Sequence, residues 1–304
     1  MASALVVGFG SIGARHARLL REAGETVAVV SRRAVDWEPR FADLPGALAE
    51  AAPGTVVIAN DTASHGATLS ALAEAGFRGR VLVEKPLLAE PAALPRHRFE
   101  RLAVGYQLRF HPGVQRLRQA LAGERIVSAC LYVGQHLAGW RPGRDYRTTE
   151  SAARERGGGA LRDLSHELDL AAWLFGSWRR VAAIGGKLSA LEIDSDDAWA
   201  VLIECESCPA VTLQMNYLNR PGRRFMVVET RDRSFELDLI AGTLLTDGRE
   251  ERFAVERDGP LRALHAALLG GKGEPACTAE EGLAVVALIA AIERSAAEGS
   301  WSRP

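Results

Sequence analysis

The sequence predicts an α/β domain on a doubly wound parallel sheet, followed by an α+β domain with a mostly antiparallel sheet. Short apolar segments alternate with helical patterns through the first 105 residues, as in parallel sheets whose strands are buried on both faces. Beyond that point, strand-like segments follow one another without helices between them, which is typical of antiparallel pairing. The length of 304 residues also fits two domains better than one.

The N-terminal region begins with a short, fully apolar run at residues 4–7, as expected of a buried strand. The helical pattern that follows has apolar side chains on one face and stops at Gly24, because glycine favours helix ends. The later elements alternate in the same way: strand 26–30, helix 44–52, strand 55–59, helix 64–75, strand 81–83 and strand 102–104.

The pattern changes after Tyr106, so we place a domain boundary near residue 105 and predict domains at 1–105 and 106–304. The second domain is predicted to contain helices and strands separated by a loop rich in Gly, Pro and Arg. The predicted segments are helix 113–121, loop 139–159, helix 160–175, and helices 261–269 and 279–297. Repeated strand-like segments separated by turn residues extend from 181 to 253, such as 198–205, 210–217 and 225–229.

Composition and charge exclude several classes of protein. A formal net charge of −1 argues against a general surface for nucleic acids or anionic membranes. No apolar run approaches the roughly 20 residues that cross a bilayer, and the N-terminus reads as a strand rather than a signal peptide. Four cysteines in a chain of this length do not form a disulfide scaffold, so we expect a reducing cytoplasm.

A glycine-rich loop follows the first strand and opens the first helix. It has the sequence Gly8-Phe9-Gly10-Ser11-Ile12-Gly13. At such a site the first glycine permits a tight turn, the second lets a pyrophosphate approach the backbone, and the third allows close helix packing. The N-terminus of the helix then offers unpaired N–H groups to the anion. The loop therefore predicts a dinucleotide-binding site.

The end of the second strand indicates which dinucleotide binds. NAD-preferring sites place an acidic residue there, whereas this strand ends in Ser31-Arg32-Arg33. Two guanidinium groups and a hydroxyl suit a 2′-phosphate, and Asp36 lies beyond the strand end. We expect NADP(H) as the cofactor in preference to NAD, with solvated loop cations as the alternative.

Two further segments carry groups that could move a proton. Lys85 follows the strand at 81–83, about 75 residues after the glycine loop. At 100° per residue, a continuous helix over 160–175 places Asp163, His166 and Glu167 in one sector beside an apolar face. Such a stripe could bind a hydroxyl group and share its proton. A capped, solvated helix start is the alternative.

Three motifs resemble those of the Gfo/Idh/MocA oxidoreductases, the group of glucose–fructose oxidoreductase and inositol dehydrogenase. They are Glu84-Lys85-Pro86, residues 105–112 (GYQLRFHP) and residues 157–169 (GGGALRDLSHELD), and residues 260–294 are similar to the closing helices of the family. The resemblance implies an N-terminal Rossmann domain and a second domain with an open, mostly antiparallel sheet. With this resemblance, the last helix could pack back on the Rossmann domain. The resemblance also implies homodimers or homotetramers formed through the sheet of the second domain.

The resemblance also implies roles for individual residues. Lys85 would lie beside the nicotinamide and assist proton transfer, with His166 and Asp163 as catalytic partners. Many members of the family place the acid four residues before the histidine rather than three, so either Asp163 or Glu167 could meet the substrate. Further candidates are Asn60, Thr62, His65 and Glu84 for the cofactor, and Arg109, Arg141, Tyr146, Arg162 and Glu167 for the substrate.

The expected function is hydride transfer by an NADP(H)-dependent enzyme to or from a sugar-like secondary alcohol or ketone. The resemblance implies that the substrate is a sugar, a cyclitol or a sugar nucleotide. One alternative keeps the cofactor tightly bound and uses internal redox for net epimerisation or hydrolysis. Another is an NADP-sensing binding protein without turnover. Cys205 and Cys208 have the spacing of a metal or redox motif but lack a second ligand pair, so we expect no metal.

Overall fold

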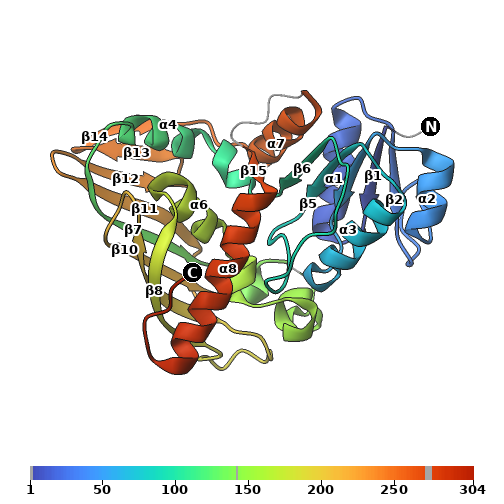
Figure 1. Ribbon diagram of the computed structural model, residues 1–304. Coiled ribbons are helices and arrows are strands. Elements are labelled where there is room, and N and C mark those ends of the chain that lie inside the picture. The colour runs from blue at the N-terminus through green and yellow to red at the C-terminus, as the bar shows by residue number, and fades with distance from the viewer. Residues whose placement is uncertain (1–2, 142, 271–275) are drawn as a thin grey trace. The chain divides into compact units, whose positions relative to one another are not determined.

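The apolar runs of the N-terminal region form neighbouring strands of one seven-stranded sheet (Figure 1). The computed structural model describes residues 3–141, 143–270 and 276–304. Its chain divides into two units, of which the first comprises residues 1–107 and 261–283 and the second comprises residues 108–260 and 284–304.

The sheet of the first unit has the strand order β15-β6-β5-β4-β1-β2-β3, and only β15 runs antiparallel to its neighbour. This arrangement confirms the predicted parallel sheet. The strands are β1 (Ala4–Val7), β2 (Val27–Val30), β3 (Arg40–Phe41), β4 (Thr55–Ile58), β5 (Arg80–Val83), β6 (Arg101–Val104) and β15 (Cys277–Thr278). The helices are α1 (Ser11–Glu22), α2 (Leu44–Ala51), α3 (His65–Glu74) and α7 (Gly259–Gly270), with the 3₁₀ turn η1 at Thr62–Ser64.

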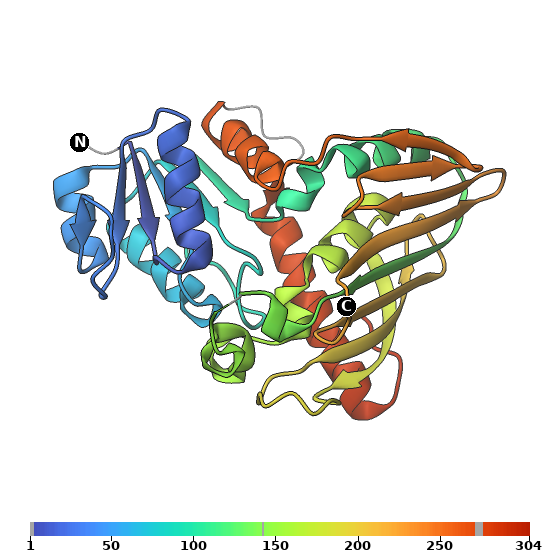
Figure 2. The ribbon, with the colours of Figure 1, turned by 180° about the vertical axis from the view of Figure 1, so that it is seen from behind.

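The central strands are buried along their whole length, because helices cover both faces of the sheet. Every residue of β1, β2 and β4 is buried, and Figures 1 and 2 show α3 and α1 on opposite faces. Residues 261–283 belong to this unit because Cys277 pairs with Val104, and because Arg101 donates a hydrogen bond of 2.6 Å to the carbonyl oxygen of Ala267.

The second unit contains an eight-stranded sheet with the order β14-β13-β12-β11-β7-β10-β9-β8. All neighbours are antiparallel except β10 and β7, which confirms a mostly antiparallel sheet. The strands are β7 (Ile126–Gly134), β8 (Trp178–Gly186), β9 (Ala198–Cys205), β10 (Val211–Asn216), β11 (Arg223–Thr230), β12 (Ser234–Asp238), β13 (Thr243–Thr246) and β14 (Arg249–Arg252). The helices are α4 (Pro112–Leu121), α5 (Ala160–Asp163), α6 (His166–Phe175) and α8 (Ala279–Glu298), and η2 to η6 are 3₁₀ turns at Gln107–Phe110, Leu137–Gly139, Tyr146–Thr148, Glu150–Ala152 and Arg154–Arg156.

Strand residues of this sheet alternate between a covered and an open face. Along β9, Trp199, Val201 and Ile203 are buried, while Leu202 between them is half exposed. Helices α5 and α6 contact β9 on the covered face, and Ser295 of α8 accepts a hydrogen bond of 3.1 Å from the backbone N–H of Ala183 in β8. The alternation follows the two-residue period of a strand that is buried on one side.

The structure differs from the sequence prediction at the helix predicted over 160–175. That segment forms two helices, α5 and α6, with a break at Leu164 and Ser165. The amide of Ser165 bonds to the carbonyl of Arg162 and the amide of Glu167 to that of Leu164, so both bonds span three residues instead of four. The assumed rotation of 100° per residue therefore does not hold from Asp163 to His166.

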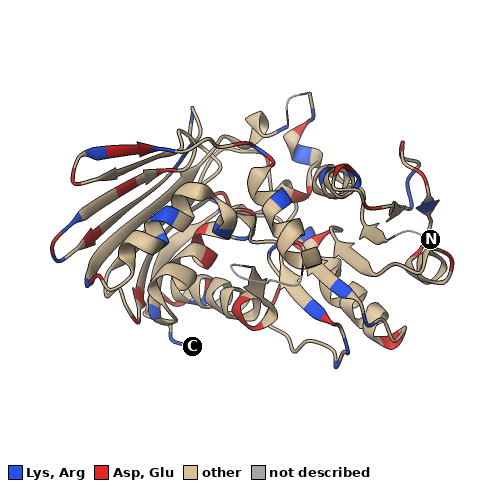
Figure 3. Cartoon of the chain, turned by 90° about the horizontal axis from the view of Figure 1, so that it is seen from above, with Lys and Arg blue, Asp and Glu red and all other residues tan. Residues whose placement is uncertain are grey.

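The predicted elements also omit β7 and the two-residue strands β3 and β15. Within the described residues, no helix combines the length and the hydropathy that a membrane span requires. Basic and acidic residues are interspersed along the chain (Figure 3), in keeping with the net charge of −1.

Candidate functional site

The loop between β1 and α1 has the geometry of a dinucleotide cradle. Gly8 has a φ of +95°, and a Cβ atom there would lie 2.6 Å from the backbone nitrogen of Asn60. A Cβ atom at Gly13 would lie 2.0 Å from the carbonyl oxygen of Gly8, so neither position accepts a side chain. Gly10 precedes α1 without a capping side chain, which leaves the helix N-terminus open to an anion. The loop residues between these glycines, Phe9, Ser11 and Ile12, are half-buried or exposed.

The turn after β2 presents two guanidinium groups. The hydroxyl of Ser31 donates to the carbonyl oxygen of Arg33 at 2.9 Å, and Arg40 donates to the carbonyl oxygen of Ser31 at 3.1 Å. Arg32 and Arg33 are exposed, and neither forms an ion pair with any described residue. The turn is therefore fixed through its backbone, while its positive charges remain available to a phosphate group.

The turn after β4 contains Asn60, Thr62 and His65. The side-chain nitrogen of Asn60 donates to the hydroxyl of Thr68 at 2.9 Å, and its Oδ1 has no hydrogen-bond partner in the described part of the chain. Thr62 is buried at the start of η1. The two ring nitrogens of His65 lie 3.0 Å from the carbonyl oxygen of Pro86 and 3.2 Å from that of Asn60, and burial lowers the pKa of His65. His65 therefore connects the turn after β4 with the turn that contains Pro86.

Glu84 and Lys85 form the turn after β5. The backbone N–H of Lys85 donates to Oε2 of Glu84 at 3.2 Å, and the Lys85 side chain is half-buried. Burial raises the pKa of the Glu84 carboxyl, but its hydrogen bond to His16 and the charges of His16 and Lys85 hold that pKa below its usual range. Glu84 is therefore a carboxylate that shapes the turn presenting Lys85.

Two buried histidines extend this arrangement. Nε2 of His16 donates to Oε1 of Glu84 at 2.8 Å, and Nδ1 of His16 lies 2.7 Å from Nε2 of His265 on α7. His16 is fully buried and His265 is 2% exposed. Burial, followed by the charges of His16, Arg15 and Arg262, lowers the pKa of His265 to about 2. A neutral imidazole thus lies at the end of a buried carboxylate–imidazole pair.

Asp163 and His166 lie at the break between α5 and α6 in the second unit. The hydroxyl of Tyr217 donates to Oδ2 of Asp163 at 2.6 Å, and Asp163 is half-buried. His166 is the first residue of α6 and is 7% exposed. Gly159 precedes α5 with a φ of +121°, and a Cβ atom there would lie 2.0 Å from Oδ1 of Asp196. The glycine run before these residues is therefore required by the local backbone.

The predicted substrate residues Arg109, Arg162 and Glu167 form ion pairs within the second unit. Their side chains are nearly inaccessible, with exposed fractions of 2%, 6% and 4% respectively. Each charge is therefore balanced by a partner inside the second unit. The pairs are Arg109–Asp169 at 2.6 Å, Arg162–Glu293 at 2.6 Å and Glu167–Arg224 at 2.7 Å.

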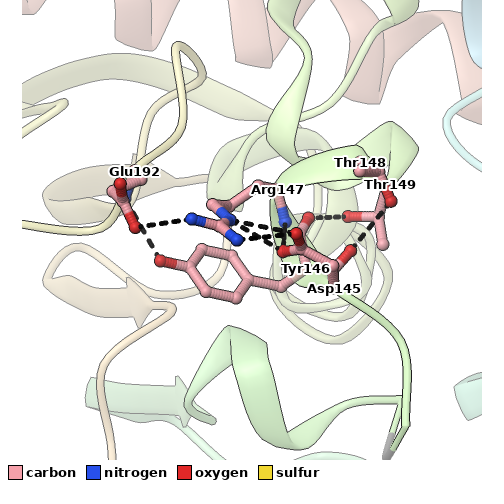
Figure 4. Close-up of polar contacts among 6 residues, drawn as sticks. All are labelled: Asp145, Tyr146, Arg147, Thr148, Thr149 and Glu192. Carbon is pink, nitrogen blue, oxygen red and sulfur yellow. Dashed lines mark hydrogen bonds and ion pairs between the residues drawn. The ribbon is translucent and has the colours of Figure 1, made fainter.

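The loop after β7 contains the remaining substrate candidates, Arg141 and Tyr146. The guanidinium group of Arg147 contacts Asp145 at 2.8 Å and Glu192 at 3.2 Å (Figure 4). The hydrogen bond from Arg147 lowers the pKa of Asp145. The hydroxyl of Tyr146 accepts a hydrogen bond of 3.4 Å from the backbone N–H of Glu192. Arg141 and Tyr146 line one pocket of this loop. Residue 142, in the same loop, lies outside the described residues.

Cys205 and Cys208 close the turn after β9, where the backbone N–H of Cys205 donates to the carbonyl oxygen of Cys208 at 3.0 Å. Both thiols are buried, and burial raises the pKa of Cys205 to about 12. Among the residues that the structure describes, no three His, Cys, Asp or Glu side chains are grouped to hold a metal ion.

Three residues of the site are not apparent from local sequence patterns: His16, His265 and Tyr217. His16 lies on the buried face of α1 beside Ala17 and Leu20. A lone histidine on an apolar helix face is the one local feature of the sequence that could have indicated a role for His16. His265 is 249 residues away from His16 in the chain, so no spacing could have linked the two.

Comparison with family models identifies both parts of the chain. A model described as "Oxidoreductase family, NAD-binding Rossmann fold" matches residues 2–99. A second, described as "GFO/IDH/MocA C-terminal domain", matches residues 114–242. A search of curated proteins finds no match.

Several solved structures are similar to this one over nearly the whole chain. GenD2 from gentamicin A biosynthesis, in complex with NAD, is 25% identical with a TM-score of 0.79, covering 99% of this chain and 95% of that chain. Levoglucosan dehydrogenase, in complex with NADH, is 18% identical with a TM-score of 0.82, covering 99% and 98%. The WlbA dehydrogenase from Bordetella pertussis, in complex with NADH and UDP-GlcNAcA, is 22% identical with a TM-score of 0.78, covering 99% and 98%.

Proposed function

Because this chain belongs to the Gfo/Idh/MocA family of oxidoreductases, we propose that it transfers a hydride between a nicotinamide dinucleotide and a sugar-like secondary alcohol or ketone. The observation that carries the proposal is the glycine cradle, in which a Cβ atom at Gly13 would lie 2.0 Å from the carbonyl oxygen of Gly8. Such close packing leaves the amides of the loop and of α1 for a pyrophosphate group. The bound dinucleotide supplies the hydride chemistry.

NADP(H) is the proposed cofactor. Arg32 and Arg33 are exposed at the end of β2, and the hydroxyl of Ser31 is beside them, so this turn can hold a 2′-phosphate. Asn60 offers an acceptor oxygen without a partner among the described residues, and Thr62 begins the neighbouring turn. The similar structures named above bind NAD or NADH, so the preference for the phosphorylated form rests on the turn after β2 alone.

Lys85, His166 and Asp163 are the proposed catalytic residues. Lys85 and His166 exchange the proton of the substrate hydroxyl, as general acid–base groups do. Asp163 orients the substrate, and Tyr217 fixes the Asp163 carboxylate through a hydrogen bond of 2.6 Å. The names of the similar structures, a levoglucosan dehydrogenase among them, support a carbohydrate substrate.

A homodimer or homotetramer formed through the open face of the second sheet is also proposed. Ile184 and Leu202 are 77% and 50% exposed on that face. The rings of Tyr132 and Phe225 stack at a centroid distance of 5.2 Å on the same face. An exposed apolar surface of this kind favours association. The four free cysteines agree with a proposed location in the cytoplasm.

Turnover with added nucleotide tests the proposal. We expect sugars to reduce NADP⁺ faster than NAD⁺, measured as the absorbance of reduced nicotinamide. Replacing Arg32 and Arg33 together by Ala should raise the KM for NADP⁺ by about 10- to 100-fold, with little change for NAD⁺. Arg78→Ala, which removes an exposed charge of the same unit, is the control. Substrate conversion that needs no added nucleotide would indicate an internal redox cycle instead.

A further inference from the structure

Buried histidines of the first unit hold the turn of Lys85 on both sides. His16 on α1 donates from Nε2 to Oε1 of Glu84 at 2.8 Å, and Nδ1 of His65 on α3 lies 3.0 Å from the carbonyl oxygen of Pro86. His16 is fully buried, and His65 is 1% exposed. The residue before Lys85 and the residue after it are therefore each tied to a helix of this unit.

The Glu84 carboxylate joins His16 to the backbone of Lys85. Its Oε2 accepts a hydrogen bond of 3.2 Å from the backbone N–H of Lys85, while its Oε1 accepts from His16. The segment after β6 leaves room for this carboxylate only because residue 105 is glycine. A Cβ atom at Gly105 would lie 2.9 Å from Oε1 and 3.2 Å from the Cα atom of Glu84. A change at His16 is therefore transmitted to the turn of Lys85 through one confined side chain.

His265 on α7 fixes the orientation of His16. Its Nε2 lies 2.7 Å from Nδ1 of His16, and its own Nδ1 has no hydrogen-bond partner among the described residues. Burial lowers the pKa of His265 to about 2, and a neutral imidazole either donates or accepts at Nε2, according to its tautomer. His265 therefore pairs with Nδ1 of His16 in both protonation states of His16, which keeps the Nε2–H of His16 directed at Glu84. Without this neighbour, a neutral His16 is free to place its only proton on Nδ1 and turn a bare nitrogen toward the carboxylate.

We propose that His16 and His265 are positioning residues for Lys85. His16 holds the Glu84 carboxylate against the backbone N–H of Lys85, and His265 keeps a proton of His16 on the nitrogen that faces Glu84. The inference deepens the proposed function and rests on it, because it takes Lys85 as the group that moves the substrate proton. A general acid–base group acts only within hydrogen-bond reach of that proton, so a small displacement of the amine slows the reaction more than it weakens binding.

Steady-state kinetics with a sugar that wild-type protein oxidises test the positioning. His16→Met removes the donor and should lower kcat by about 10- to 100-fold, with a change of less than about 3-fold in the KM for the dinucleotide. His16→Gln places an amide N–H near the position of Nε2 and should recover most of kcat. His265→Met and His265→Gln form a second such pair, with a smaller loss in the Met variant because His16 is retained. Leu20→Met changes a buried apolar residue of α1 and should keep the wild-type kcat.

Two further measurements need no turnover. Acetylation of lysines by an N-hydroxysuccinimide ester can be followed by peptide mass spectrometry, with Lys187 of the second unit as the internal reference. His16→Met should raise the rate at Lys85 at least about 3-fold relative to Lys187, because the turn is no longer fixed at Glu84, whereas His16→Gln should not. If His16→Met does not fold, His265→Met gives the same comparison. Ring ¹⁵N spectra of wild-type protein, which require no variant, should show a proton on Nε2 of His16.

Wild-type kcat in the Met variants, or unchanged reactivity of Lys85 in them, would overturn the proposal. Equal losses of kcat in the Gln and Met variants would do the same, because a role in packing alone does not depend on the hydrogen-bond donor. A bare Nε2 in the ring spectra of His16 would also overturn it. If the reactivity of Lys85 responds as expected but no sugar is oxidised with either nucleotide, the proposed function fails while the positioning of the turn stands. The two failures are therefore distinguishable.

Discussion

His265 gives a prediction for the pH dependence of stability. Its side chain is 2% exposed, and burial together with neighbouring charges lowers its pKa from 6.5 to about 2. Above the unfolded value of 6.5 the imidazole is neutral in both states. Below it, the unfolded chain binds a proton that the folded protein does not bind until the pH nears 2. Acid therefore lowers the free energy of unfolding through this residue.

The size of the effect follows from the two pKa values. Between pH 6.5 and about 2 the loss is up to about 1.4 kcal/mol per pH unit for one group. Acidification from about pH 8 to about pH 5 then removes about 2 kcal/mol of stability through His265. His65 and His111 also have lowered pKa values, because burial opposes their charged forms, and they add to the loss in the same direction.

Urea unfolding of wild-type protein and His265→Gln at both pH values isolates this contribution. The Gln side chain has no charge to gain, and His65 and His111, which are not among its contacts, cancel in the difference. His16 contacts residue 265, and Gln can still offer it a hydrogen-bond partner. The stability advantage of wild type over the variant should shrink by about 2 kcal/mol on acidification to about pH 5. An advantage that stays constant with pH would refute the assignment of His265 as a buried neutral imidazole.

Two predictions concern the glycine loop and the buried ion pair of Arg109. Gly10→Ala should leave the unfolding temperature unchanged but weaken dinucleotide binding in a fluorescence titration, because a Cβ atom there meets no protein atom within 4 Å. Gly13→Ala should lower both the unfolding temperature and the affinity for the dinucleotide, since its Cβ atom would lie 2.0 Å from the carbonyl oxygen of Gly8. Equal unfolding temperatures of the two variants would contradict this expectation. Asp169→Asn should lower the free energy of unfolding by about 3–5 kcal/mol, measured by urea unfolding, because it leaves the guanidinium group of Arg109 buried without its carboxylate. A loss below about 1 kcal/mol would show that the ion pair contributes little to stability.

The elements that the sequence predicted well are those whose local pattern matches their burial. The run 4–7 is apolar because β1 is covered on both faces, and the alternation in 198–205 matches β9, which is covered on one. The break between Asp163 and His166 has no such signal, because its residues are compatible with a continuous helix. The two-residue strands β3 and β15 are too short to show any period.

The ion-pair partners of the charged residues could not be predicted from the sequence. Arg162 was a candidate for an anionic substrate, yet it pairs with Glu293, which is 131 positions away. Such pairs are set by packing of distant segments, and no local spacing reveals them. The glycine loop could be interpreted from sequence because Gly8 and Gly13 act within a single turn of the chain.

A double-mutant cycle on Lys85 and His166 tests whether the two residues act on one substrate proton. With a sugar that wild-type protein oxidises, Lys85→Met and His166→Gln should each lower kcat/KM by about 10²- to 10⁴-fold, while dinucleotide binding is retained. If the two groups exchange the same proton, the double variant should be no worse than the poorer single variant. Losses that multiply in the double variant, or a single variant with wild-type activity, would contradict the proposed catalytic pair.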